Sequence, residues 1–167
     1  MASSNRVLII DDQTAIVQLL EEFLSDEGYD VEGITDAVEA LDRLHRPPRP
    51  DLLVLDLMMP QVTGWEVLDA LRSDPATADV PVILLTAAPR QGQVEFTRRR
   101  PDHTILLAKP IGLDELLIQV AAMLNDREPP GHATGGDHPK SSSTGRAAES
   151  PDSQSARRSF TRPGFAS

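Results

Sequence analysis

The stretch LLVLDLMMP, Leu52 to Pro60, is an apolar run that contains one carboxylate, Asp56. A short apolar run of this kind is typical of a buried strand in a parallel sheet. A buried carboxylate without a partner is costly, so such a group normally takes up a proton, pairs with a cation or binds a metal. The stretch therefore predicts a central strand that ends at Asp56, and it predicts a partner for the charge of that residue.

Other short apolar runs predict four more strands. In chain order they are VLII at 7–10, the more alternating YDVEGI at 29–34, which suits an edge strand, VILLT at 82–86 and TILLA at 104–108. Four segments have apolar residues at helical spacing, namely 16–24, about 36–45, about 63–72 and 113–124. In 87–100, Pro89 and Gly92 disfavour a long helix, and at most a short helix is expected.

Strands that alternate with helices predict right-handed crossovers and a doubly wound parallel sheet with helices on both faces. The expected fold class is therefore α/β, with five strands and five helices, one helix being irregular. Binding sites in such sheets lie just beyond the carboxyl ends of the strands.

The composition changes near residue 125. Residues 1–125 hold almost all the long apolar runs, whereas 126–167 are rich in Ser, Pro, Gly and Arg, which predicts one domain and a disordered tail. The domain has 10 Lys and Arg against 21 Asp and Glu, a formal charge of −11. Because nucleic acid is bound through basic surfaces, no direct DNA binding is expected.

Several classes of protein are disfavoured by what the chain contains. It has no cysteine, so neither a disulfide framework nor a thiolate metal site is expected. The amino-terminal apolar run has only four residues, and no run approaches the length of a membrane span. A cytoplasmic protein without membrane contact is the resulting expectation.

Polar side chains follow four of the predicted strands at their carboxyl ends. They are Asp11 and Asp12, Asp56, Thr86 and Lys109. Each alone has an ordinary explanation as a helix cap or a loop residue, but the carboxyl ends of parallel strands share one edge of a sheet. Like charges about 4 Å apart cost roughly 4 kcal/mol at an effective dielectric near 20. One lysine and one divalent cation balance the three acids, and ligation by oxygen alone favours Mg²⁺.

The segments VLIIDD, LLVLDLMMPQVTGWEVL, VILLTA and LLAKPIGLDEL together resemble the receiver domain of bacterial response regulators over roughly residues 5–125. The resemblance implies a flavodoxin-like (βα)5 fold, with the tail 126–167 outside it. It implies phosphorelay signalling by a single phosphoacceptor domain. The implied partners are a sensor histidine kinase or a histidine phosphotransfer protein, and a downstream protein that is not identified.

The resemblance also implies a role for each residue at the sheet edge. Asp56 is the phosphoacceptor, and Mg²⁺ is held by Asp12, Asp56 and the backbone carbonyl of Met58, with Asp11 binding the ion through water. Lys109 contacts the phosphoryl oxygens, and Thr86 turns toward them once they arrive. Pro110, which follows Lys109, is expected after a cis peptide bond.

The sequence departs from the family pattern at three positions that matter for signalling. Leu106 lies three residues before Lys109, where receivers commonly have Tyr or Phe, so the aromatic rotamer switch is missing. Met58 and Ala88 occupy positions where relatives tune the access of hydrolytic water. Both are apolar here, which predicts a long-lived phosphoryl group.

Two other classes of function compete with the phosphoacceptor. A hydrolase of the aspartyl-phosphate type usually has a second acid two residues after its nucleophile, but that position is Met58. A constitutive interaction module that has lost phosphorylation is disfavoured by the intact acids, threonine and lysine at the strand ends. The expectation is therefore a signalling domain that assists only its own phosphorylation and dephosphorylation.

Overall fold

The structure of the protein is a computed structural model that describes residues 4–126. Five parallel strands form one sheet in the order β2-β1-β3-β4-β5. The strands are β1 (Arg6–Ile10), β2 (Asp30–Ile34), β3 (Leu52–Asp56), β4 (Val82–Thr86) and β5 (Thr104–Ala108). The predicted α/β fold class is confirmed. The predicted tail lies almost wholly outside the described residues, so its boundary at 126 stays a prediction.

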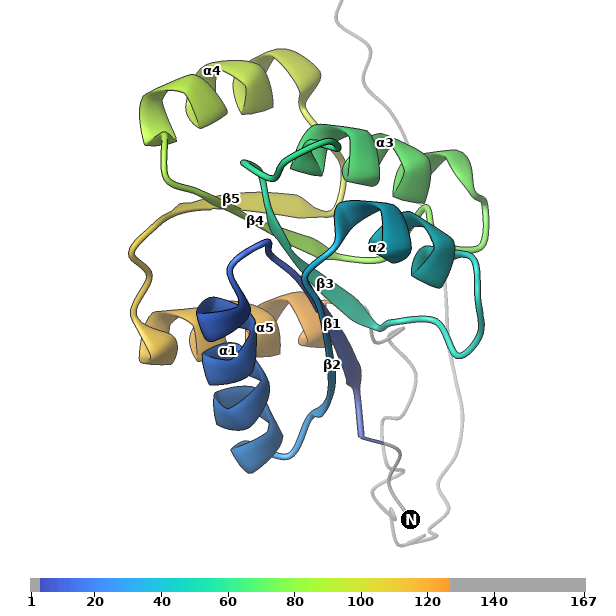
Figure 1. Cartoon of the computed structure of the whole chain (residues 1–167), viewed down its shortest axis with the longest axis vertical. Coiled ribbons are helices and arrows are strands. Elements are labelled where there is room, and N and C mark those ends of the chain that lie inside the picture. Colours follow the sequence, from blue (N-terminus) through green and yellow to red (C-terminus); the bar gives the residue numbers. More distant parts are fainter. Residues whose placement is uncertain (1–3, 127–167) are drawn as a thin grey trace, which may run out of the picture. The chain divides into compact units, whose positions relative to one another are not determined.

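Five helices cover the two faces of the sheet (Figure 1). Helices α1 (Thr14–Asp26) and α5 (Leu113–Asn125) lie on one face, and α2 (Ala37–Leu44), α3 (Gly64–Ser73) and α4 (Pro89–Arg99) lie on the other. Among residues 4–126, no helix combines the length and the apolar content needed to cross a bilayer.

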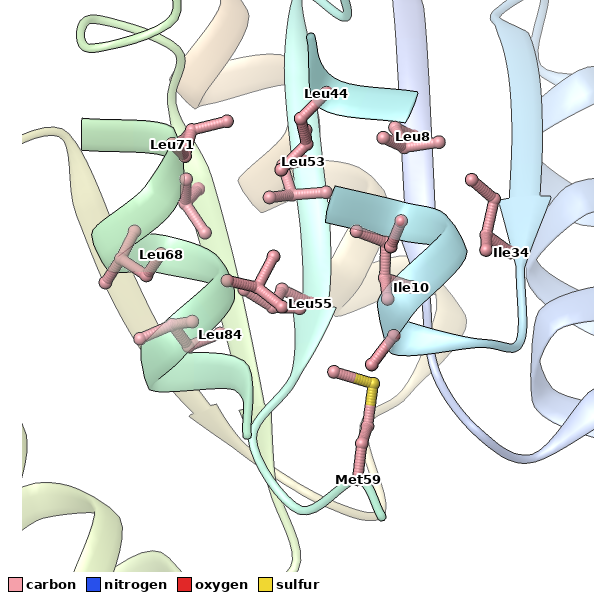
Figure 2. Packing of buried hydrophobic residues seen from close by; sticks show 14 of the residues in the cluster. Leu8, Ile10, Ile34, Leu44, Leu53, Leu55, Met59, Leu68, Leu71 and Leu84 are labelled. Carbon is pink, nitrogen blue, oxygen red and sulfur yellow. The ribbon is translucent and has the colours of Figure 1, made fainter. Parts of the chain in front are cut away.

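The sheet separates two apolar cores, because alternate residues of each strand point to opposite faces. The first core joins β1, β3 and β4 to α2 and α3, and Figure 2 shows Leu53, Leu55, Leu68 and Leu84 within it. The second core packs the other face of these strands against α1 and α5. Strand β3 is buried along its whole length, so the first core and the second together hold Asp56 in a fixed central strand.

Helix α3 begins with a capping box that directs the chain away from the end of β3. The side-chain oxygen of Thr63 accepts the backbone N–H of Glu66 at 3.3 Å, and Glu66 accepts the backbone N–H of Thr63 at 2.8 Å. Hydrogen bonds from the backbone and side chain of Thr63 also lower the pKa of the Glu66 carboxyl group. The start of α3 is thereby fixed close to the end of β3.

Helix α4 is longer and more regular than the sequence predicted. It runs unbroken from Pro89 to Arg99, so the expectation of at most a short helix at 87–100 is wrong. Pro89 occupies the first turn, where its missing N–H breaks no helical bond. Gly92 is the one buried residue of α4 and lies against the sheet, so here the glycine serves close packing.

Candidate functional site

Three carboxylates meet at the carboxyl edge of the two central strands. Asp11 and Asp12 directly follow β1, and Asp56 ends the neighbouring β3. One carboxylate oxygen from each of the three lies within 4.8 Å of the others. Asp11 and Asp56 are buried, while Asp12 is exposed. The structure thus brings together the three acids that the sequence placed at this edge.

Lys109 enters the same site from the end of β5. Its Nζ donates to Oδ2 of Asp11 at 2.5 Å and forms an ion pair with Oδ1 of Asp56 at 3.0 Å. The side chain is only 13% exposed, so water screens these contacts poorly. The backbone N–H of Lys109 donates to the carbonyl of Thr86 at 2.8 Å, and the Lys109–Pro110 peptide bond is cis, as predicted.

Burial and the charge of Asp11 raise the pKa of the Asp56 carboxyl group, whereas the neighbouring cation acts in the opposite direction. Burial raises the pKa of the Asp56 carboxyl group, while Lys109 and the backbone N–H of Met58 lower it, and the net shift is upward. For Lys109, burial lowers the pKa, but Asp11 and Asp56 together outweigh it and leave a raised value. The lysine therefore stays a cation, and a carboxylate at position 56 remains only partly compensated.

Thr86 and Met58 flank the acids at the same edge of the sheet. Thr86 is 1% exposed, and its hydroxyl oxygen accepts the backbone N–H of Ala88 at 3.0 Å. The hydroxyl therefore points toward the start of α4. The Met58 side chain is 58% exposed, so the residue presents an apolar group to solvent beside the site.

The donor set fits a hard divalent cation. Oδ1 of Asp56 is buried and has no well-directed hydrogen-bond donor among the described residues, although Lys109 lies 3.0 Å away as an ion pair. Oδ1 of Asp11 accepts the backbone N–H of Gln13 at 2.9 Å, which fixes that carboxylate in place. A buried oxygen without a donor, inside an all-oxygen cluster of excess negative charge, is an environment that suits Mg²⁺.

Gly64 is a site residue that the sequence reasoning missed. A side-chain Cβ at this position would lie 2.3 Å from the backbone oxygen of Asp56 and 2.8 Å from Cα of Leu57. The Gly64 N–H also donates to the carbonyl of Leu57 at 3.2 Å. The first turn of α3 therefore supports the backbone of the loop that follows Asp56. The pattern TGWE, a capping box, was the signal in the sequence that places Gly64 at the start of this helix.

Replacing Gly64 with alanine is expected to destabilise the fold by about 1–3 kcal/mol, because the methyl group overlaps rigid backbone rather than a movable side chain. Urea unfolding measures the change. The matched control is Gly112→Ala, since a Cβ at Gly112 meets nothing within 4 Å. Equal unfolding midpoints for the two variants would show that Gly64 gives the loop no support.

The fold and the site together define a doubly wound α/β domain with an acidic sheet edge whose carboxylates could hold a metal ion. The family model for the response regulator receiver domain matches residues 7–121, and the chain belongs to this family. Receiver domains are phosphoacceptor domains of bacterial two-component systems that bind Mg²⁺ at an acidic pocket, and Asp11, Asp12 and Asp56 supply such a pocket here.

Individual relatives agree with this assignment. The DNA-binding dual master transcriptional regulator RpaA of Synechocystis sp. is 40% identical over 131 residues, a match that covers 74% of this chain and 52% of the relative. The response regulator MprA of Mycobacterium tuberculosis is 39% identical over 128 residues, or 75% of this chain and 53% of that protein. The chain spans about half the length of these curated relatives.

Among solved structures, the chemotaxis protein CheY4 of Vibrio cholerae superposes with a TM-score of 0.64 at 30% identity, covering 72% of this chain and 99% of that one. The receiver domain of the Francisella response regulator 1452 superposes with a TM-score of 0.65 at 30% identity, covering 75% and 100%. The flavodoxin-like (βα)5 architecture is thereby confirmed.

The expectation that excluded direct DNA binding is corrected by these relatives. RpaA is a DNA-binding regulator, and 40% of the residues in its matched region are identical to those of this chain. A relative of this acidic domain therefore binds DNA. The charge of the matched domain was a poor guide because the match leaves about half of the relative uncovered. An acidic receiver domain is therefore compatible with a DNA-binding regulator, and its charge carries no argument against one.

Proposed function

We propose that this chain accepts a phosphoryl group on Asp56 from a phosphohistidine of a histidine kinase, in a reaction that needs Mg²⁺ and takes place in the cytoplasm. The observation that carries the proposal is the position of Asp56. It lies at the end of a fully buried strand, with Asp11 and Asp12 within 4.8 Å and Lys109 in contact. The phosphoryl signal is then passed on through protein contacts of the domain.

The transfer forms one bond and breaks one. An oxygen of the Asp56 carboxylate attacks phosphorus, the P–N bond of the phosphohistidine breaks, and its electron pair returns to the imidazole nitrogen. Such a reaction needs mainly in-line positioning and compensation of negative charge. Bound Mg²⁺ would supply positive charge to the phosphoryl oxygens. Asp11, Asp12, Asp56 and the carbonyl of Met58 would hold the ion, and Lys109 would provide the second cation.

The charge left at the site after transfer gives a reason for the Thr86 hydroxyl to turn toward the phosphoryl group. After transfer the site holds about −2 from Asp11 and Asp12 and about −2 from the phosphoryl group, against about +3 from the metal and Lys109. A residual near −1 favours the approach of neutral donors. The Thr86 hydroxyl, now bonded to the Ala88 N–H, is the donor that can turn toward the phosphoryl oxygens.

Incubation of the chain with Mg²⁺ and acetyl phosphate tests the proposal. Intact mass is expected to rise by about 80 Da, the mass of one phosphoryl group. The matched control is Asp56→Asn, which keeps the shape of the side chain and removes the nucleophile, so no adduct is expected. A wild type without an adduct, or an adduct of equal yield in Asp56→Asn, would contradict the assignment of Asp56.

The lifetime of the phosphoryl group is a separate prediction. Met58 is 58% exposed and Ala88 is the N-cap residue of α4, and neither side chain has a polar atom with which to hold a hydrolytic water. The double variant Met58→Asn with Ala88→Glu is expected to lose its phosphoryl group several-fold faster than the wild type, because both new side chains can bind that water. Decay of the adduct after removal of the donor gives the rate, and an equal or slower decay contradicts the prediction.

A further inference from the structure

Arg90 has an exposed guanidinium group that forms no ion pair or hydrogen bond within the part of the chain that the structure describes. Most Lys and Arg side chains of residues 4–126 do have a carboxylate partner, namely those of Arg6, Arg43, Arg46, Arg49, Arg98, Arg99 and Lys109. Arg72 donates to backbone carbonyls instead. Only Arg90 and Arg100 remain unpaired, in a domain where acids outnumber these cations by 21 to 10.

The place of Arg90 in its helix is electrostatically unfavourable. Arg90 is the second residue of α4, and the amino end of a helix carries a partial positive charge that disfavours cations. Three other helices follow this rule with acids in the first turn, which are Glu39 in α2, Glu66 in α3, and Asp114 and Glu115 in α5. Helix α4 has no acid there. A departure from a local rule of this kind is expected where function requires it.

Arg90 is held at the carboxyl edge of the sheet, beside the acids. Thr86 ends β4 at this edge, and its Oγ1 accepts the backbone N–H of Ala88 at 3.0 Å. Gly92 approaches the same threonine so closely that a Cβ there would lie 3.1 Å from Cγ2 of Thr86. Arg90 lies between these two contacts. Residues two apart on a helix point to different sides, so Gly92 faces the sheet while Arg90 is exposed to solvent.

The charges of the site explain what an unpaired cation can do at this edge. The carboxylates of Asp11, Asp12 and Asp56 together with Lys109 have a formal charge of −2, and the phosphoryl group of a donor carries about −2 as well. Bound Mg²⁺ would cancel the charge of the site, but it leaves little net attraction for a distant anion. A cation exposed at the same edge attracts anions from solution and raises their rate of encounter.

We propose that Arg90 captures the phosphoryl group of an incoming donor by its charge and guides it to Asp56. The proposal deepens the proposed function and rests on it. A guanidinium group suits this role because its planar set of N–H donors matches the oxygens of a phosphoryl group. Arg90 acts on the approach of the donor, and it takes no part in forming the bond to Asp56 or in breaking the bond to the leaving group.

The full chain with saturating Mg²⁺ and a low concentration of acetyl phosphate provides the test. Arg90→Gln is expected to slow formation of the phosphoryl adduct about fivefold at low salt, and Arg90→Glu about 20-fold. In about 1 M KCl, where charges are screened within about 3 Å, the Arg90→Gln rate should come within about twofold of the wild type. Unchanged rates at low salt, or a loss that salt does not reduce, overturns the proposal.

The matched control is Arg100→Gln. Arg100 is the other unpaired arginine and follows the last residue of the same helix, about 15 Å from Arg90 along the helix axis. Its replacement removes the same charge far from the acids, so the rate of adduct formation is expected to stay within about 1.5-fold of the wild type. Equal losses in Arg90→Gln and Arg100→Gln would show an effect of net charge alone and overturn the proposal.

The charge of the donor gives a second readout. Phosphoramidate has an amino group that is protonated near neutral pH and offsets one phosphoryl charge, so Arg90→Gln is expected to slow its reaction only about twofold. Decay of the adduct uses neutral water and should stay within about twofold of the wild type. Equal losses with both donors overturn capture by charge. A wild type that forms no adduct with either donor overturns the proposed function itself, so the two failures are distinct.

Discussion

Replacing Lys109 with methionine is expected to slow phosphorylation of Asp56 about 100-fold and, at the same time, to tighten the binding of Mg²⁺. The two effects have one cause. Nζ of Lys109 lies 2.5 Å from Asp11 and 3.0 Å from Asp56, so it is the only cationic side chain within ion-pair distance of these acids among residues 4–126. Loss of one well-placed charge that stabilises a transition state typically costs about 10²–10³ in rate.

The opposite sign for metal binding follows from the same distances. Without the lysine, no cationic side chain compensates the carboxylates, and the interaction of unit charges about 4 Å apart is worth roughly 4 kcal/mol at an effective dielectric near 20. A divalent cation then has no competing cation in the site. The dissociation constant for Mg²⁺ is therefore expected to fall about tenfold or more.

Adduct formation with acetyl phosphate, followed by mass spectrometry, gives the rate, and calorimetric titration gives the Mg²⁺ affinity. The control is Arg46→Met, which removes the same formal charge from an exposed ion pair that follows α2. A rate within tenfold of the wild type would remove Lys109 from the transfer step. Weaker Mg²⁺ binding by Lys109→Met would show that the lysine holds the carboxylates in place for the metal rather than competing with the metal for them.

The sequence was a good guide to the strands because each is five residues long and has a continuous or alternating apolar pattern. It also placed Asp11, Asp12, Asp56 and Lys109 at one edge, since the carboxyl ends of parallel strands coincide. It failed at α4, where local propensity marked Gly92 as a helix breaker. Tertiary packing overrides that propensity, because the residue lies against Thr86 and leaves little room for a larger side chain.

Two features of the site depend on side-chain conformation and helix packing, which the sequence pattern does not determine. The sequence places the Thr86 hydroxyl at this edge of the sheet. Its hydrogen bond from the Ala88 N–H depends on the side-chain rotamer of Thr86, which the sequence does not reveal. The close approach of Gly64 to the Asp56 carbonyl brings the first residue of α3 against the last residue of β3, and this distance is set by how the helix packs. The residues that meet at this edge of the sheet were thus predictable, whereas the packing that holds them in position was not.

The largest effect on stability is expected at Arg72, at the opposite end of the strands from the site. Its Nη1 donates to the carbonyls of Ala78 at 2.9 Å and Val80 at 2.8 Å, and its Nη2 donates to the carbonyl of Asp102 and to Oγ1 of Thr104, both at 3.0 Å. One guanidinium group thereby ties the end of α3 to the chain entering β4 and β5. Arg72 is partly buried, and this burial lowers the pKa of its guanidinium group, an effect that Asp102 and Asp79 partly offset.

Arg72→Met is expected to lower the free energy of unfolding by about 3–5 kcal/mol, because a partly buried charge and its hydrogen bonds are lost and four backbone carbonyls are left without this donor. Arg72→Lys should recover little, since an ammonium group cannot reproduce the planar fork. Arg46→Met, at an exposed ion pair, should cost at most about 0.5 kcal/mol. Urea unfolding measures all three variants.

Binding of beryllofluoride, a mimic of the phosphoryl group, is a separate readout that distinguishes a structural role of Arg72 from a role in the site. The acids and the lysine lie at the carboxyl ends of the strands, whereas Arg72 binds the chain at their amino ends. Folded Arg72→Met is therefore expected to bind beryllofluoride within about twofold of the wild type at a temperature well below its unfolding transition. A stability loss under about 1 kcal/mol would refute the anchoring role. A folded variant that no longer binds beryllofluoride would show instead that the two ends of the sheet are coupled.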